Sequence, residues 1–358
     1  MSEAKTLEFK PDLEDATRRW LAFWEHEIID RPVCCVRAWK DNVVQGWGPP
    51  YLAGARDDFG PVISSVLDYN SKVWNGGEAV PSYTPSFGPD MMAAWLGADL
   101  EFDEGEFGTN WVVANVKDWE ESLPLTLNPE NYWWKRMLAF CTELGKALDG
   151  KMVVAHLDLH SNADLLSALR SPQKLCFDMY DEPELIDRAM ANARALYQPI
   201  YDALYDAGLM ANYGTTGWVT AYHPVKTNTI QCDFAALIGP SQFKRWVVPA
   251  LEEEAAYLEH CVYHYDGPEC LVHMDDICAI KGLDCIQWVH GARNKEFIEW
   301  IDLLKEFQAR GCSVWIPCTP EQVKFYHKEL KPELLYYDCW ASSQQEGEEL
   351  LQWLTDNT

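Results

Sequence analysis

The chain is short of positive charge. Among its 358 residues, 29 are Lys or Arg and 56 are Asp or Glu, so the formal net charge is −27. Binding to nucleic acid or to an anionic membrane surface needs a basic surface, which this composition can supply only locally. The chain also lacks the run of ~18 apolar residues that a membrane-spanning helix needs. We therefore expect neither nucleic acid nor a membrane among its partners.

Common cysteine signatures are missing as well. The chain has 12 cysteines but no Cys-x-x-Cys pair, which argues against a zinc ribbon and against a thioredoxin-like site. It opens without an apolar signal segment, and disulfide scaffolds are typical of short secreted chains. We therefore expect a cytoplasmic protein in which most cysteines are small buried side chains.

Tryptophan, in contrast, is abundant. The chain has 17 Trp beside 16 Tyr and 13 Phe. Because tryptophan combines a large ring with a polar N–H, this enrichment fits aromatic-lined cavities, and it fits an aromatic-rich core equally well.

From about residue 150 onward, short β-rich runs alternate with amphipathic helical patterns. Strands are expected at 152–159, 229–237, 261–264, 283–289, 313–317 and 334–339, with helices between them. Such alternation predicts parallel strands joined by right-handed crossovers. Because no Gly-x-Gly-x-x-Gly motif or P-loop follows any strand, we favour a closed (β/α)8 TIM barrel over an open doubly wound sheet.

Residues 1–150 are less regular. They are expected to supply the first strand, at 32–38, and loops such as 46–52 and 82–90 that lie over the barrel mouth. Residues 1–30 are expected to form a helical extension. The whole chain, 1–358, is then a single domain, and the sequence leaves open whether it forms a homodimer.

In a parallel barrel the active site lies at the C-terminal ends of the strands, which form the mouth. Polar and aromatic side chains gather where the expected strands end, so they are candidates for catalysis and binding. They are His156, Asp158, His160, Trp218, Tyr222, Asp233, His264, Asp266, Trp288, His290, Cys339 and Trp340.

The segment 263–269 is the most informative of these. His264 and Asp266 are two residues apart, so both side chains project from one face of an extended chain, and Glu269 can return at the start of the next helix. Together with Cys339 they predict a zinc site with one open position. In the alternative, Asp266 caps the turn before Pro268, His264 bonds to backbone and Cys339 lies in the core.

Three segments resemble a known family: 165–184 (LLSALRSPQKLCFDMYDEPE), 233–249 (DFAALIGPSQFKRWVVP) and 263–291. In them the chain resembles the uroporphyrinogen decarboxylase-like superfamily, which contains decarboxylases and cobalamin-linked methyltransferases. The resemblance implies a (β/α)8 barrel and leaves the reaction open.

Two motifs, one typical of the decarboxylases and one of the methyltransferases in this superfamily, help to choose between the two reactions. The arginine-rich signature of the decarboxylases is absent from 31–41, although the Arg-Pro strand entry remains, and a polycarboxylate substrate suits a chain of charge −27 poorly. The methyltransferases place zinc on His-x-Cys and a distant Cys. Here His264-Tyr-Asp266 and Cys339 take those places, and a carboxylate makes a harder site, suited to polarising the leaving atom of a methyl ether or amine.

The preferred hypothesis is methyl transfer from a small aromatic methyl ether or related donor to a corrinoid (cobalamin) on a carrier protein. Zinc is expected on His264, Asp266 and Cys339, with Glu269 in reserve. A decarboxylase of another small acid, using Asp233 or Asp158, and a non-catalytic binding barrel are the alternatives. Catalytic roles are predicted for His156, His160, Asp233 and His290, and substrate contacts for Asp158, Trp218, Tyr222, Trp288, Trp340 and His273.

Overall fold

The computed structural model describes residues 5–56, 58–103, 108–291 and 294–358. Its centre is a seven-stranded sheet with the order β2-β1-β13-β12-β11-β10-β9. All neighbouring strands pair in parallel except β1 and β2, which are antiparallel. The strands are β1 (Val33–Trp39), β2 (Val73–Gly77), β9 (Thr227–Gln231), β10 (His260–Asp266), β11 (Leu283–Val289), β12 (Ser313–Cys318) and β13 (Leu335–Trp340).

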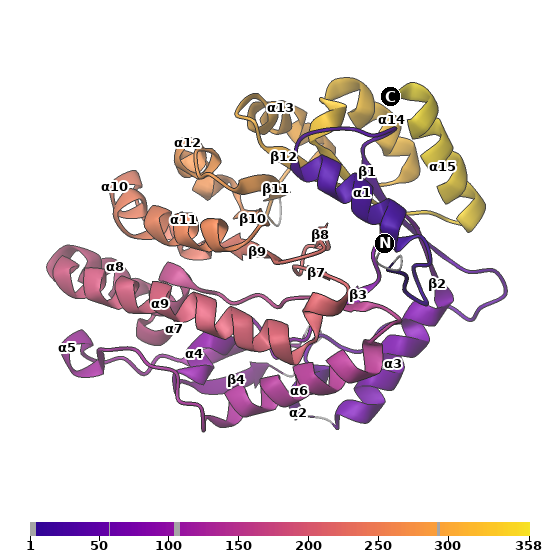
Figure 1. The fold of residues 1–358 in the computed structure, drawn as a ribbon. Coiled ribbons are helices and arrows are strands. Elements are labelled where there is room, and N and C mark those ends of the chain that lie inside the picture. The colour runs from indigo at the N-terminus through magenta and orange to yellow at the C-terminus, as the bar shows by residue number, and fades with distance from the viewer. Residues whose placement is uncertain (1–4, 57, 104–107, 292–293) are drawn as a thin grey trace.

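Helices connect the successive parallel strands on the outside of the sheet, in chain order (Figure 1). Their ends follow local sequence signals. At α14, for example, the Thr319 side chain accepts a hydrogen bond from the Gln322 N–H, and Pro320 occupies the first turn, where its missing N–H costs nothing. The connecting helices are α11 (Val248–Tyr257), α12 (Met274–Cys278), α13 (Ile301–Ala309) and α14 (Pro320–Glu329), and α15 (Gln344–Asn357) follows the last strand.

The other half of the molecule has long helices and very short strands. β3 (Ser82–Tyr83) pairs in parallel with β6 (Val153–Val154), and the His156 N–H beyond β6 donates to Thr216 of β7 (Thr215–Thr216) at 2.7 Å. The helices here are α3 (Phe59–Lys72), α4 (Met91–Trp95), α6 (Tyr132–Leu148), α7 (Asn162–Arg170), α8 (Pro172–Asp181) and α9 (Pro183–Ala207). The smaller elements are α2 (Ala53–Arg56), β4 (Asp99–Asp103), β5 (Thr109–Val113), α5 (Trp119–Ser122), β8 (Tyr222–His223) and α10 (Pro240–Gln242).

The architecture is therefore α/β with a mostly parallel central sheet, as predicted, and it is compatible with a (β/α)8 barrel. The described strands form one large sheet and three two-stranded ones, so their ladder is not continuous around a closed barrel. The interruption falls where β3, β6 and β7 are only two residues long. Full closure of the barrel stays a prediction.

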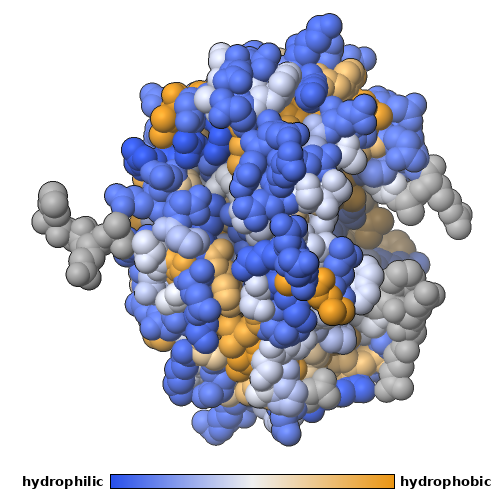
Figure 2. Space-filling model, turned by 90° about the vertical axis from the view of Figure 1, so that its right-hand side faces the viewer, coloured by the Kyte–Doolittle hydropathy of each residue, from blue (hydrophilic) through white to orange (hydrophobic). Residues whose placement is uncertain are grey.

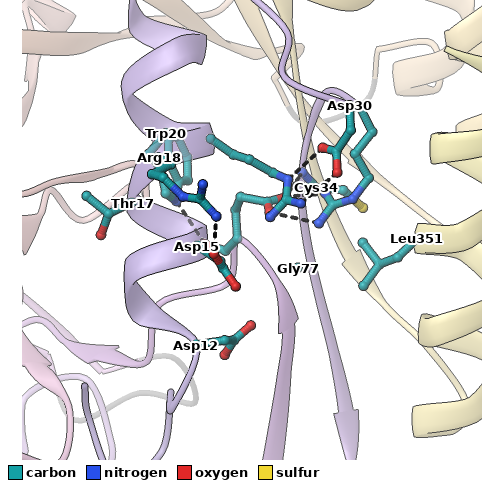
Figure 3. A network of polar contacts seen from close by, with 12 residues as sticks. Asp12, Asp15, Thr17, Arg18, Trp20, Asp30, Cys34, Gly77 and Leu351 are labelled. Atoms are coloured by element: carbon teal, nitrogen blue, oxygen red, sulfur yellow. Dashed lines mark hydrogen bonds and ion pairs between the residues drawn. The ribbon is translucent and has the colours of Figure 1, made fainter. Parts of the chain in front are cut away.

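The N-terminal helix α1 (Leu13–Trp24) lies within the predicted extension over 1–30 and is held against the sheet by charged side chains, with Arg19 on the helix 3.7 Å from the buried Glu78. Arg19 forms two hydrogen bonds of 2.7 Å with Asp30, and Arg31 donates to the buried Glu78 at 2.9 Å. The backbone N–H of Cys34 also donates to Glu78, at 2.9 Å. Figure 3 shows this network between α1 and the strand that carries Cys34.

The outer surface agrees with the acidic composition. Hydrophilic residues dominate the face in Figure 2, with hydrophobic residues in smaller spots between them. None of the helices in the described ranges combines the length and apolar character needed to cross a bilayer.

Candidate functional site

Asp233, His264 and Asp266 form a compact group at the C-terminal ends of β9 and β10. His264 and Asp266 lie on β10, and Asp233 opens the short 3-10 helix Asp233–Leu237 after β9. Each offers one ligand atom, and these atoms lie within 4.8 Å of one another. The sequence predicted His264 and Asp266 as ligands and Asp233 as a catalytic residue, and the structure brings all three together.

Gln287 on β11 fixes the orientation of the His264 ring. The His264 Nδ1 lies 2.7 Å from Gln287 Oε1, an acceptor to which Nδ1 can donate, and this contact leaves Nε2 facing Asp233. That Nε2 lies 3.9 Å from Asp233 Oδ1. The Trp218 ring packs against the imidazole at 4.9 Å between ring centroids, which restricts its rotation. The histidine is thus held with a free nitrogen facing the two carboxylates.

Asp233 has an unsatisfied oxygen in this group. The Gln231 side-chain amide donates to Oδ2 at 3.2 Å, whereas Oδ1 is buried without a hydrogen-bond partner among the described residues. Burial and then the nearby Asp164 raise the pKa of Asp233 to about 7. A buried carboxylate oxygen without a donor is costly, and a bound cation removes that cost. Oxygen and imidazole donors therefore fit a divalent cation such as zinc here.

His160 lies on the other side of Asp233, in a set of carboxylates. Its Nε2 is 3.4 Å from Asp158 and 3.8 Å from Asp233, and its Nδ1 is 3.6 Å from Asp90. Burial opposes its protonation, but Asp158, Asp90 and the other carboxylates outweigh burial and raise the pKa of His160 to about 10. It is therefore an imidazolium at neutral pH, able to donate a proton and unable to accept one.

Asp164, in the first turn of α7, fixes the position of the backbone at Asp233. Its side chain is buried and accepts the backbone N–H groups of Asp233 at 3.0 Å and Phe234 at 2.8 Å. Sequence reasoning missed Asp164, because an acidic residue in a first helical turn is ordinary. It also missed Asp90, although this residue ends the loop 82–90 that was expected over the mouth. Only the folded chain brings them to His160.

A cavity of about 420 Å³ opens beside this cluster. Asp90, His160, Asp164 and Asp233 supply its polar wall. The hairpin strand β5 and the start of α8 supply much of the remainder, through residues that include Trp111, Val112, Ser171 and Pro172. The cavity has room for a small organic molecule next to the candidate cation site.

Two predicted zinc ligands lie outside the group. The Cys339 thiol is buried on β13, with its Sγ 3.5 Å from the Sγ of Cys318. The hydrogen bond with Cys318 raises the pKa of Cys339, which disfavours the thiolate that would bind zinc. Glu269 lies in the 3-10 helix Pro268–His273 and does not join His264 and Asp266. Asp233 takes the place that Cys339 was predicted to occupy.

Several other candidates have the contacts of core side chains. His156 is fully buried and stacks on Tyr201 at 3.9 Å, and His273 is fully buried and stacks on Phe243 at 4.1 Å. Tyr222 and Trp288 are each 1% exposed. None of these four lines the cavity beside Asp233.

The last two candidates lie elsewhere at the strand ends. His290 follows β11, with its ring centroid 6.3 Å from that of Phe297. Trp340 ends β13 and is 41% exposed. The group centred on Asp233 thus draws together Asp158, His160, Trp218, His264 and Asp266 from the sequence-based set.

Comparison with known proteins supports the fold. No protein-family model and no curated protein sequence matches the chain. Among solved structures, a methyltransferase from Methanosarcina mazei is similar, with a TM-score of 0.60 and 14% sequence identity over 96% of this chain and 98% of that one. At this identity the likeness shows a shared fold along nearly the whole chain. The superfamily that the sequence segments resemble stays a prediction.

Proposed function

We propose that the protein transfers a methyl group from a small methyl ether or related donor to the corrinoid of a separate carrier protein. The observation that carries the proposal is the group Asp233, His264 and Asp266, which offers a cation three ligand atoms within 4.8 Å of one another beside a cavity. The fold shared with a solved methyltransferase supports the same reaction class.

Asp233, His264 and Asp266 would hold a zinc ion, oriented by the Gln287 contact to His264. Zinc, when bound, supplies a Lewis acid for the leaving oxygen of the donor. Three protein ligands leave the fourth position of a tetrahedral ion open for that oxygen, as in other catalytic zinc sites.

The chain's own residues would handle the proton. Loss of a methyl group from an ether leaves an alkoxide or phenoxide, which needs a proton to depart as an alcohol or phenol. His160 is the donor in place, because Asp158 and Asp90 keep it protonated and it lies at the wall of the cavity. Trp218 covers His264 and limits the access of water to that side.

Metal content tests this assignment. The purified protein is expected to contain about one zinc per chain by elemental analysis, and His264→Ala and Asp233→Asn are expected to lose it. Asp275→Asn is the matched control, because Asp275 lies on α12 and pairs with Arg310 away from the group. Protein without zinc, with methyl transfer insensitive to chelators and to His264→Ala, would sink the proposal.

One observation also favours a second candidate, decarboxylation of a small acid without a metal. The pKa of Asp233, raised to about 7 by burial and by Asp164, gives the cavity an acid that can exchange a proton near neutral pH. Release of CO₂ from candidate acids by metal-free protein, abolished in Asp233→Asn, would support this reaction over methyl transfer.

A further inference from the structure

A second cavity at the same edge of the sheet is lined almost entirely by aromatic rings. Its volume is about 470 Å³, and its walls are Trp39, Trp47, Tyr69 and Trp340 together with the Gln45–Gly46 segment. Trp39 ends β1 and Trp340 ends the neighbouring parallel strand β13, with Arg37 and Trp340 in register. Because β10 runs in the same direction, Asp266 ends at this edge too.

The rings of this aromatic cavity form a shaped wall. Trp39 is packed between Tyr69 and Trp340, with 5.6 Å between ring centroids in both pairs and interplanar angles of 83° and 62°. Trp47 stands apart on its loop and is 96% exposed, although a tryptophan ring in water is unfavourable. A planar ring placed in the cavity would give Trp47 an apolar partner and would meet ring faces and edges on the other side.

The charges around the cavity favour a neutral ligand. None of its lining residues is charged. Below it, Arg37 donates to Asp338 at 2.6 Å and to Thr220 at 3.2 Å, so that ion pair is internally neutral. A quaternary ammonium ion, the other ligand that aromatic walls attract, would find no carboxylate in this lining to pair with its charge.

We infer that this cavity binds the neutral aromatic ring of a small molecule. The segment 218–220 lies between Arg37 and the candidate cation site, because Thr220 accepts a hydrogen bond from Arg37 and Trp218 packs on His264. The two cavities share no lining residue, so this aromatic site goes beyond the proposed function and lies apart from the cavity beside His160 that the proposed function uses. Binding itself requires neither zinc nor the carrier.

The test measures binding of methoxybenzene to the full-length protein by isothermal titration calorimetry, without a corrinoid. Trp47→Ala and Trp340→Ala are each expected to weaken binding by about tenfold, and Trp47→Phe to restore most of it. Trp47 and Trp340 are exposed, so these changes leave the core intact. Tyr180→Ala is the matched control, because Tyr180 on α8 is 73% exposed and lines neither cavity.

Cyclohexyl methyl ether and tetramethylammonium serve as comparison probes. The inference expects both to bind more weakly than methoxybenzene. It is overturned if methoxybenzene does not bind, if its affinity is unchanged in both alanine variants, or if tetramethylammonium binds more tightly at a site that Trp47→Ala abolishes. Binding of methoxybenzene without methyl transfer would defeat the proposed function and leave the aromatic site standing, whereas methyl transfer without binding of methoxybenzene at this aromatic cavity would do the reverse.

Discussion

At the scale of single residues, buried titratable groups outside the proposed reaction give the protein a pH-dependent stability. Burial lowers the pKa of His156 to about 4, because the imidazole is enclosed and stacked on Tyr201. The unfolded chain takes up a proton below its ordinary pKa of about 6.5, while the folded chain does not until pH 4. The free energy of unfolding is thus expected to fall by up to about 3 kcal/mol from this residue as the pH drops from 6.5 to 4.

Urea unfolding at pH 7, 5.5 and 4.5 checks this expectation. His156→Phe is expected to lower stability at pH 7, since it removes the one N–H of the neutral imidazole, which lies against the buried carbonyls of Leu157 and Tyr201. Its loss of stability toward acid pH should nevertheless be shallower than that of the wild type. An identical pH dependence in the two proteins would contradict the burial argument.

The contribution of Glu254 to stability depends on pH in the opposite direction to that of His156. It is buried on α11 and accepts a hydrogen bond from Ser161 at 2.6 Å, next to the His160 turn. Burial raises the pKa of Glu254 to about 8. Because the folded state then holds a proton that the unfolded state releases above its ordinary carboxyl pKa, the stability contribution of Glu254 decreases as the pH rises from about 4.5 to 8.

Glu254→Gln keeps an oxygen for Ser161 and cannot ionise. Relative to the wild type, the variant is therefore expected to gain stability from pH 5 to about pH 8 and to level off above that, as measured by urea unfolding. Glu252 lies exposed on the same helix, so Glu252→Gln serves as the control and should show no such gain. A constant difference between Glu254→Gln and the wild type across this range would refute the assignment.

At the scale of elements, Glu78 links α1 to the start of β1, because its carboxylate lies 2.9 Å from the buried Arg31 and 3.7 Å from Arg19 of that helix. Glu78→Ala leaves the Arg31 guanidinium buried without its carboxylate, which is expected to cost about 3–5 kcal/mol in the free energy of unfolding. Asp15→Ala removes only the exposed contact with Arg18 on the same helix (Figure 3) and should cost less than about 1 kcal/mol. Similar losses in the two variants would show that Glu78 does not anchor α1.

The elements also show how far the sequence predicts the structure. Strand 283–289 and the helix beginning at Pro183 agree with β11 and α9, because hydrophobic patterns and proline are local signals. The expected strand 229–237 is wrong beyond Gln231, since Asp164 binds the N–H groups of Asp233 and Phe234 and a 3-10 helix forms there. The expected end of one strand placed His264 and Asp266 side by side. Asp90, Asp164 and Gln287 come from distant segments of the chain, and only the tertiary structure brings them to this site.

At the scale of the whole molecule, the excess of acidic residues extends to the candidate site and affects which ligands suit it. The net charge is −27, and two of the buried or half-buried arginines, Arg31 and Arg37, each bind a carboxylate of the chain. In the acidic group it is His160 that carries the positive charge, among Asp90, Asp158 and Asp233. Such a site suits a neutral methyl donor and a cation better than a polycarboxylate.

Methyl transfer itself tests the central claim most directly. Zinc-loaded protein is mixed with reduced Co(I) cobalamin, which stands in for the carrier-bound corrinoid, and with methoxybenzene, and the visible absorbance of methylcobalamin is followed. Methylcobalamin is expected to form with the wild-type protein, and His264→Ala and Asp233→Asn are expected to reduce the rate by at least about a hundredfold. No methylcobalamin with the wild type, or equal rates in His264→Ala, would contradict it.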